Sequence, residues 1–287
     1  MSGTAKTANH TSTKKLLLKI LLYVFVILVC MVILYPYFVM FTTAAKSRAE
    51  IYSPNGTLLP IKWVLSNFTD IWSRAPMARY FLNSLIVAGG ATFLAILCGI
   101  PAAYALARMK FRGRNVFLGF VIVSQMFSAV VLLIGIYKVM ILFNLTNNLL
   151  GLVFVNAAFN QAFAIWLLRG TFLSISPEME QAATIDGCNR VQALLKILLP
   201  MAAPGIVTTL IFIFINAWNE YTVALTLISS DTLKPLTVGI TIFNGYNMIE
   251  WQYLFAASLF ATIPVIILFA CIEKHLVGGL TSGGVKG

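Results

Sequence analysis

Long runs of apolar residues alternate with polar segments along the whole chain. The runs cover residues 16–41, 81–107, 116–137, 149–168, 201–225 and 252–272. A helix needs about 20 predominantly apolar residues to span a bilayer, so each run is long enough for one crossing. The first run is also longer than the apolar region of a signal peptide, which has about 7–15 residues. The pattern therefore predicts an all-α integral membrane protein with six transmembrane helices.

The polar segments divide the chain into regions. Residues 1–15 are polar and basic, which predicts a disordered tail. Residues 42–80 form the longest polar segment and contain turn signals such as Pro54-Asn55-Gly56. We expect a first transmembrane helix at 16–41, a loop at 42–80, a five-helix core at 81–277 that includes a polar stretch at 170–200, and a Gly-rich tail at 278–287.

Composition supports the membrane class. Hydrophobic residues make up 60% of the 287 residues, charged residues make up only 10%, and the mean hydropathy is +0.90. The formal net charge is +11, and in a membrane protein such an excess usually reflects orientation. The basic residues are not interleaved with aromatic residues on a polar face, which argues against nucleic-acid binding.

Basic residues are distributed unevenly over the two sides that six spans create. If both termini are cytoplasmic, 13 of the 20 Lys and Arg residues lie on the cytoplasmic side. The strongest signal is at residues 108–114, where four bases occur without an acid. The loop at 42–80 carries five bases of its own on the other side. The distribution predicts cytoplasmic termini, an extracytoplasmic loop at 42–80 and a cytoplasmic stretch at 170–200.

The stretch SPEMEQAATIDGC, residues 176–188, has the signals of a short helix. Ser176 can cap a helix whose first residue is Pro177. Glu178 and Glu180 fall in the first turn, where carboxylates interact favourably with the helix dipole. Gly187 can end the helix in a left-handed conformation. A second short helix is expected from residue 189 to about residue 198.

One face of this predicted helix is small and partly apolar. Met179, Ala182, Ala183 and Asp186 are spaced at i, i+3, i+4 and i+7. Such a face suits a helix that lies in the groove of a partner protein. It also suits an amphipathic helix that lies on the membrane surface. The residues alone leave both interpretations open.

The segment PEMEQAATIDGCNRVQALLKILLPMAAP resembles the EAA loop of binding-protein-dependent ABC importer permeases. Ala182-Ala183, Asp186-Gly187 and Leu199-Pro200 occupy the positions that this pattern requires. Gln181 occupies the position of the usual glutamate and lacks its charge. Glu180 is adjacent, but it points about 100° away on a helix and does not replace that glutamate.

Five further segments extend the resemblance over most of the chain. They resemble the carbohydrate-importer subfamily, and in particular its smaller, maltose-transporter-type inner permease. They are TLLPIKWVLSNFTDIW, NSLIVA, AAYALARMKFRGR, AWNEYTVAL and GGLTSGGVKG.

The resemblance implies a type I ABC importer permease fold with a cytoplasmic coupling helix in the EAA loop. It implies a bacterial inner-membrane location, a second permease that forms a heterodimer with this chain, two ATPase subunits that bind ATP and Mg, and an extracytoplasmic binding protein that delivers a sugar. The implied ATPase-coupling residues are Glu180, Gln181, Ala182, Ala183, Asp186, Gly187, Leu199 and Pro200. The C-terminal tail, with Gly283, Gly284 and Lys286, is a second implied ATPase contact, although its composition equally fits a flexible end.

The sequence offers no catalytic or metal site of its own. The G-K-[ST] element of a P-loop is absent, so we expect no ATPase activity and no cofactor in this chain. His10 and His275 are far apart, and the four cysteines form no C-x-x-C pair, which argues against a metal site. A membrane enzyme lacks support because G-x-S-x-G is also absent.

Polar residues inside the runs are candidates for a substrate pathway. The candidates are Gln125, Asn156, Asn160, Asn216 and Asn219. Their amides could bind sugar hydroxyls, or they could form hydrogen bonds between helices. Glu220 is the only carboxylate inside a run, and at mid-membrane it would cost about 2.5–3.5 kcal/mol on insertion scales. An ion-coupled secondary transporter, which typically has a midplane carboxylate, is therefore the alternative function.

Overall fold

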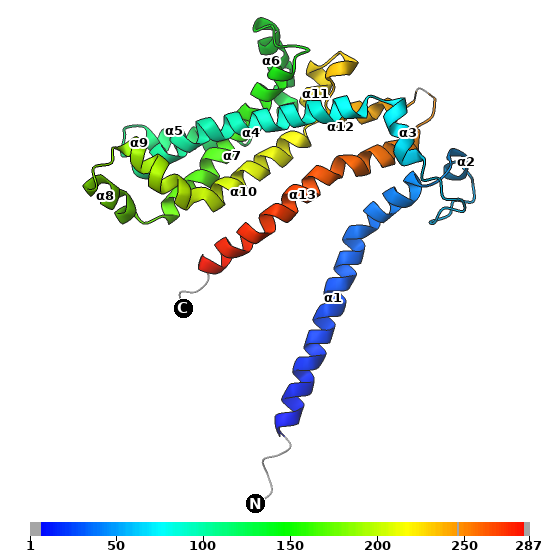
Figure 1. Cartoon of the computed structure of the whole chain (residues 1–287), viewed down its shortest axis with the longest axis horizontal. Coiled ribbons are helices and arrows are strands. Elements are labelled where there is room, and N and C mark those ends of the chain that lie inside the picture. Colours follow the sequence, from blue (N-terminus) through cyan, green and yellow to red (C-terminus); the bar gives the residue numbers. More distant parts are fainter. Residues whose placement is uncertain (1–6, 246, 284–287) are drawn as a thin grey trace, which may run out of the picture. The chain divides into compact units, whose positions relative to one another are not determined.

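The computed structural model describes residues 7–245 and 247–283, with side chains for 15–245 and 247–271. Helices dominate, and in these residues the only β-pairing is an isolated bridge between Asn244 and Ile249. The elements (Figure 1) are α1 (Thr7–Ala44), α2 (Arg48–Ile51), α3 (Asn67–Arg74), α4 (Met77–Arg108), α5 (Arg114–Ser124), α6 (Ala129–Leu142), α7 (Leu149–Ser174), α8 (Pro177–Ile185), α9 (Arg190–Ala193), the π-helical segment η1 (Leu194–Leu198), α10 (Leu199–Trp218), α11 (Thr222–Leu227), the 3-10 turn η2 (Asp231–Leu233), α12 (Leu236–Gly239), the 3-10 turn η3 (Ile240–Phe243) and α13 (Trp251–Gly283).

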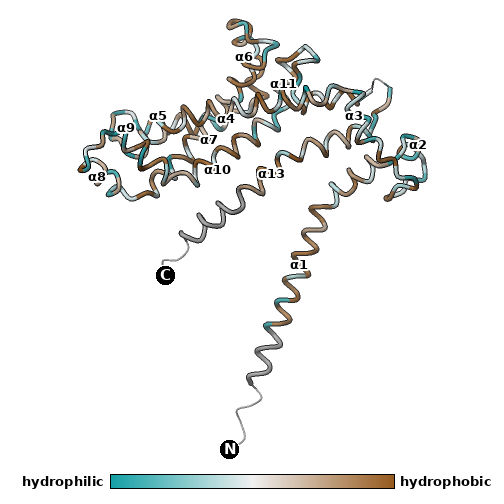
Figure 2. Tube along the Cα trace, viewed as in Figure 1, coloured by the Kyte–Doolittle hydropathy of each residue, from teal (hydrophilic) through white to brown (hydrophobic). Residues whose placement is uncertain are grey.

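Five of these helices are long and apolar enough to cross a membrane. The spans are Lys15–Ala44, Met77–Arg108, Leu149–Ser174, Arg190–Trp218 and Trp251–Cys271. Hydrophobic residues follow α4, α7 and α10, whereas hydrophilic residues gather around α2 and α8 (Figure 2). Five of the six predicted spans are therefore continuous helices.

The predicted third span at 116–137 is not one straight helix. It consists of α5 and α6, which meet at an angle of 103°. Ser128 starts α6, because its hydroxyl accepts a hydrogen bond of 3.3 Å from the Val130 N–H. The polar residues Ser124, Gln125 and Ser128 surround the break, and they were the available signal for it.

The bent pair crosses the bundle as one span. At one end of α4, the Arg108 side chain donates a hydrogen bond to the Ile175 carbonyl just after α7. At the other end of α4, Asn83 binds the Thr232 carbonyl, and Asn147 just before α7 binds Ser230. Because α4 and α7 start at the same end of the bundle, the chain between them must return along its whole length. The pair α5–α6 makes that return, which gives six crossings.

Small residues allow close packing between α4, α7 and α10. Ala88, Ala91 and Ala95 of α4 are fully buried. A Cβ on Gly90 would lie only 3.0 Å from Val153 of α7. The prediction that the small residues of the second span pack inside a bundle is therefore confirmed.

The chain divides into two compact units, Met1–Ile71 with Phe243–Leu259, and Trp72–Ile242 with Phe260–Gly287. In the first unit, Asn67 ties the end of α1 to the following loop, since its amide donates to the carbonyls of Ala44 at 2.8 Å and Lys46 at 2.9 Å. Arg48 lies 3.8 Å from the Glu250 carboxylate.

The helix boundaries correct three predictions. Helix α1 starts at Thr7, inside the predicted disordered tail, because residues 7–15 contain neither Gly nor Pro and adding turns to an existing helix costs little. The predicted span at 201–225 is also too long, since α10 ends at Trp218. Helix α13 continues to Gly283, beyond the predicted end of the last span at residue 272, and Gly284 and Lys286 lie outside the described residues.

Candidate functional site, the hairpin between α7 and α10

Helix α8 begins and ends as its sequence predicts. The Ser176 hydroxyl accepts a hydrogen bond from the Glu178 N–H at 3.3 Å, and Pro177 is the first helical residue. At the other end, Gly187 has φ of +83°. The Gly187 N–H donates to the Thr184 carbonyl and the Cys188 N–H to the Ala183 carbonyl, which is the Schellman pattern of helix termination.

The second half of the hairpin leads continuously into the membrane. Asn189 and Gln192 form a reciprocal capping box at the start of α9, with both hydrogen bonds at 2.9 Å. The π-helical segment η1 then joins α9 to α10. The predicted helix at 189–198 is confirmed, with a local change of helix type before the transmembrane segment. We call residues 176–198 the coupling hairpin.

A buried apolar cluster supports the coupling hairpin at its base. It joins α4, α7, η1 and α10 and contains Ala103, Tyr104, Ala107, Leu168, Phe172, Ile175, Leu194, Leu198 and Ala202. Tyr104 packs edge-on against Phe172, with ring centroids 6.1 Å apart. The cluster fixes the hairpin to three transmembrane helices.

The far side of the coupling hairpin is exposed and unusually apolar. Ile185 is 87% exposed, Val191 is 63% exposed and Met179 is 41% exposed. The predicted coupling residues Gln181, Ala182, Asp186 and Gly187 are exposed or partly exposed as well. The exposed apolar side chains therefore lie at the tip of the coupling hairpin, away from the helix bundle.

Two predicted coupling residues do not belong to this surface. Ala183 is only 1% exposed, because α8 must pack one face against α9 and η1. Glu180 faces α4, where one carboxylate oxygen accepts a 2.5 Å hydrogen bond from the Tyr104 hydroxyl and the other lies 3.4 Å from Nε of Arg108. Ala183 and Glu180 therefore face the rest of this chain, and their part in ATPase coupling stays a prediction.

The contacts of Tyr104 and Arg108 with Glu180 were not predicted from the sequence, in which Arg108 counted only as a marker of membrane orientation. The available signal was their spacing of four residues at the end of a predicted span, which places both side chains on one face of the helix.

The remaining two predicted coupling residues lie at the start of α10. Leu199 is half-buried and packs against the apolar cluster at the base of the hairpin. Pro200 is exposed in the first turn of α10, where its missing N–H breaks no helical hydrogen bond. Both residues join the hairpin to the membrane and lie away from its exposed tip.

The predicted substrate-pathway residues fall into two groups. Asn156 and Asn160 are 3% and 7% exposed, and their amide groups donate to the carbonyls one turn earlier in α7. The Asn160 side-chain oxygen also accepts a hydrogen bond from Asn216 of α10 at 3.3 Å. Asn156 and Asn160 therefore form their hydrogen bonds within the helix bundle of this chain, and their role in a substrate pathway stays a prediction. Gln125, Asn216 and Asn219 are exposed.

Glu220 lies between α10 and α11 and not inside a span. Its two carboxylate oxygens accept hydrogen bonds from the N–H groups of Val223 at 2.6 Å and Ala224 at 3.0 Å, at the start of α11. Burial raises the pKa of the Glu220 carboxyl, while these backbone donors act in the opposite direction. The residue starts a helix after the fifth crossing.

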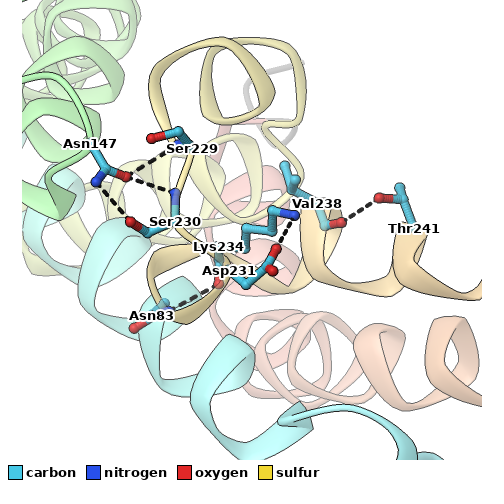
Figure 3. Close-up of polar contacts among 8 residues, drawn as sticks. All are labelled: Asn83, Asn147, Ser229, Ser230, Asp231, Lys234, Val238 and Thr241. Carbon is cyan, nitrogen blue, oxygen red and sulfur yellow. Dashed lines mark hydrogen bonds and ion pairs between the residues drawn. The ribbon is translucent and has the colours of Figure 1, made fainter.

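A polar network closes the opposite end of the bundle (Figure 3). The Asn147 side-chain oxygen accepts from the N–H groups of Ser229 at 3.1 Å and Ser230 at 2.9 Å. The Asn83 amide donates to the carbonyls of Thr232 at 2.9 Å and Lys234 at 3.0 Å. This network fixes the segment after α11 to the starts of α4 and α7.

Among residues 15–245 and 247–271, whose side chains the structure describes, no group of three or more His, Cys, Asp or Glu could hold a metal ion. The four cysteines are free thiols.

Comparisons with known proteins agree with this architecture. Residues 95–281 match the family described as binding-protein-dependent transport system inner membrane component. The chain is 35% identical to the sulfoquinovosyl glycerol transport system permease protein SmoH of Agrobacterium fabrum over 88% of this chain and 89% of SmoH. It is 31% identical to the trehalose/maltose transport system permease protein MalG of Thermococcus litoralis over 96% of this chain and 99% of MalG.

A solved structure shows the same fold. It is the crystal structure of a bacterial ABC transporter involved in the import of the acidic polysaccharide alginate, with a TM-score of 0.78 and 24% identity over 95% of this chain and 99% of that chain. The type I importer permease fold is therefore confirmed, with five continuous candidate spans and the bent pair α5–α6 as the sixth. ATP hydrolysis in such systems lies in separate subunits, so the chain is a transport subunit and not an enzyme. The chain belongs to the family of binding-protein-dependent transport system inner membrane components, as the permease of an ABC transporter.

Proposed function

We propose that the chain imports a sugar or a sugar-derived solute, which an extracytoplasmic binding protein delivers. Support comes from its relatives, because SmoH and MalG are named for the transport of sulfoquinovosyl glycerol and of trehalose or maltose. In this proposal a second, different permease completes the pathway. Two ATPase subunits, which hold ATP and Mg, supply the energy.

In this proposal the ATPase binds the exposed tip of the coupling hairpin. Ile185 and Val191 are 87% and 63% exposed, although they lie in the polar stretch between two apolar runs. Exposed apolar side chains on a short, well-capped helix suit insertion into a partner's groove. Gln181 and Asp186 can add hydrogen bonds at the rim of that contact.

The orientation of the chain follows from charge. Lys110, Arg112 and Arg114 lie next to the end of α4 that holds the coupling hairpin. Basic loops of this kind remain on the cytoplasmic side. With six crossings, both termini then lie in the cytoplasm of a bacterium, and the loop at 42–80 lies outside.

Co-purification with matched variants tests the docking site. The tagged permease, extracted from its own host in mild detergent, should retain an ATPase chain and a second permease. Ile185→Glu should lose the ATPase chain but retain the second permease. Ile61→Glu changes an apolar residue that is 78% exposed in the loop at 42–80 and should retain both. Retention of the ATPase by Ile185→Glu would remove the hairpin tip from the interface.

Uptake measurements test the solute class and the energy source. Cells that lack the chain should lose uptake of one carbohydrate from a panel that includes trehalose, maltose and sulfoquinovosyl glycerol. Transport in proteoliposomes of the complex should require ATP, stop with vanadate and persist with a protonophore. Transport that stops with the protonophore and needs no ATP would favour the ion-coupled alternative.

A further inference from the structure

Three side chains join the coupling hairpin to helix α4 through direct side-chain contacts, in addition to the backbone that connects α8 to α7 and α9. Tyr104 and Arg108 of α4 both face Glu180 of α8. The Tyr104 hydroxyl donates to Glu180 Oε1 at 2.5 Å, and Nε of Arg108 lies 3.4 Å from Glu180 Oε2. We call these three residues the clamp.

Arg108 also holds the end of the preceding transmembrane helix. Its Nη2 donates a 2.6 Å hydrogen bond to the carbonyl of Ile175, the residue that follows α7. A cation at this place also interacts favourably with the negative end of the helix dipole. Arg108 therefore binds both the end of α7 and the start of α8.

The clamp is shielded from solvent, which strengthens its contacts. The side chains of Arg108 and Glu180 are 9% and 23% exposed, and Tyr104 is 7% exposed. Hydrogen bonds to charged groups gain strength when water is excluded. Nε of Arg108 has no well-aligned hydrogen bond, so its contact with Glu180 is mainly electrostatic.

The two neighbouring positions on α8 have opposite surroundings. Glu180 faces α4, whereas Gln181 is exposed on the hairpin surface. Glu180 therefore holds α8 against α4 directly beside the exposed Gln181. Helix α4 carries Asn83 at its other end, where it binds the segment after α11.

We propose that Tyr104, Arg108 and Glu180 are positioning residues that make α8 and α4 move together when the ATPase displaces the coupling hairpin. The clamp transmits the displacement from the hairpin to the far end of the bundle through one continuous helix. The proposal rests on the proposed docking of an ATPase, and it assigns Glu180 to force transmission within this chain.

Spin-label distances test the clamp without any solute. Labels are placed at Ile185→Cys on α8 and Leu97→Cys on α4, which are 87% and 57% exposed, after Cys30, Cys98, Cys188 and Cys271 are changed to Ser. With the intact clamp, the permease should show one narrow distance distribution. Glu180→Gln should broaden it, whereas Glu178→Gln, the same change at an exposed site in the same turn, should not. An unchanged distribution in Glu180→Gln would overturn the proposal.

Transport and ATP hydrolysis, measured in the complex with the ATPase, distinguish transmission of movement by the clamp from a role of the clamp in folding alone. Glu180→Gln removes the charge from the contacts with Tyr104 and Arg108, so it should retain the ATPase chain but lower the solute transported per ATP hydrolysed by about tenfold. An equal fall in transport and hydrolysis would show a merely structural role and overturn the proposal.

Exchanging the charges of Arg108 and Glu180 tests whether the two side chains act through direct contact. Arg108→Glu and Glu180→Arg should each uncouple transport, and the double variant should recover part of the coupling, whereas no recovery would count against a direct contact. If no ATPase chain binds the wild-type permease, the proposed function fails. The label distributions in the permease alone still decide whether the clamp joins α8 to α4.

Discussion

Gly205 of α10 lies directly against Thr171 of α7, so that a Cβ on Gly205 would be only 2.3 Å from the Thr171 hydroxyl oxygen and 2.9 Å from the Thr171 Cβ. No side-chain rotation of Thr171 moves its Cβ away. The contact fixes how closely the two transmembrane helices approach near the base of the coupling hairpin.

Gly205→Ala should therefore destabilise the permease by about 1–3 kcal/mol, as overpacking does in other protein interiors. Thermal unfolding of the protein in detergent measures the change. Gly170→Ala is the matched control, since no atom lies within 4 Å of a Cβ at Gly170. Equal melting temperatures for both variants would contradict the close contact.

The hydrogen bond between Asn160 and Asn216 should contribute to the stability of the bundle. A double-mutant cycle with Asn160→Ala and Asn216→Ala should give a coupling energy of about 0.6 kcal/mol, the average for hydrogen bonds between transmembrane helices. The apparent affinity for the transported solute should stay unchanged in Asn160→Ala, because this side chain is buried. A coupling energy of zero would indicate that the 3.3 Å contact is not formed.

Gly187→Val should abolish uptake while membrane insertion remains normal. The backbone at Gly187 has φ of +83°, which a β-branched residue rarely adopts, so the turn after α8 must rearrange. Gly187→Asn should retain part of the activity, since Asn144 and Asn147 of this chain already have positive φ. Uptake and membrane content are measured together, and normal uptake by Gly187→Val would exclude a coupling role for this turn.

Cys188 reports the side on which the coupling hairpin lies. It is a free, half-buried thiol next to Gly187. In a variant with Cys30, Cys98 and Cys271 changed to Ser, a membrane-impermeant maleimide should label Cys188 in inverted vesicles and not in intact cells. Labelling of intact cells would reverse the proposed orientation.

Glu220 should give the stability of the permease a dependence on pH. Its folded-state pKa is raised by burial above the value of 4.5 for a free side chain. The folded state therefore holds the proton more tightly, and this stabilisation is present below pH 4.5 and is lost as the pH rises through the raised pKa. Melting temperatures in detergent should fall over this range in the wild type. Glu220→Gln should remove the fall in melting temperature that is due to this carboxyl group. An identical pH dependence of the melting temperature in both proteins would contradict the role of Glu220.

Local signals allowed the coupling hairpin to be predicted in detail. Ser176, Pro177 and Gly187 act through the backbone of their own helix, so their roles follow from neighbouring residues alone. The inward orientation of Ala183 and Glu180 depends on α9, η1 and α4, and no local pattern in the stretch reveals it. Tyr104 and Glu180 are 76 residues apart in sequence and meet only through the packing of α4 against α7.

Hydropathy predicted where the chain crosses the membrane better than it predicted the form of each crossing. A window over residues 116–137 averages the apolar residues on both sides of Gln125 and Ser128, and it hides the break between α5 and α6. The end of α10 at Trp218 was missed for a similar reason, because α11 is also apolar and continues the hydrophobic run.

The break between α5 and α6 has a consequence for what surrounds it in the membrane. A helix bent by 103° interrupts the ladder of backbone hydrogen bonds, and Gln125 at the break is exposed on this chain. Hydrocarbon offers no partner to the backbone groups that such an interruption frees. We therefore expect that lipid tails do not cover this stretch in the assembled transporter and that a neighbouring protein or water contacts it.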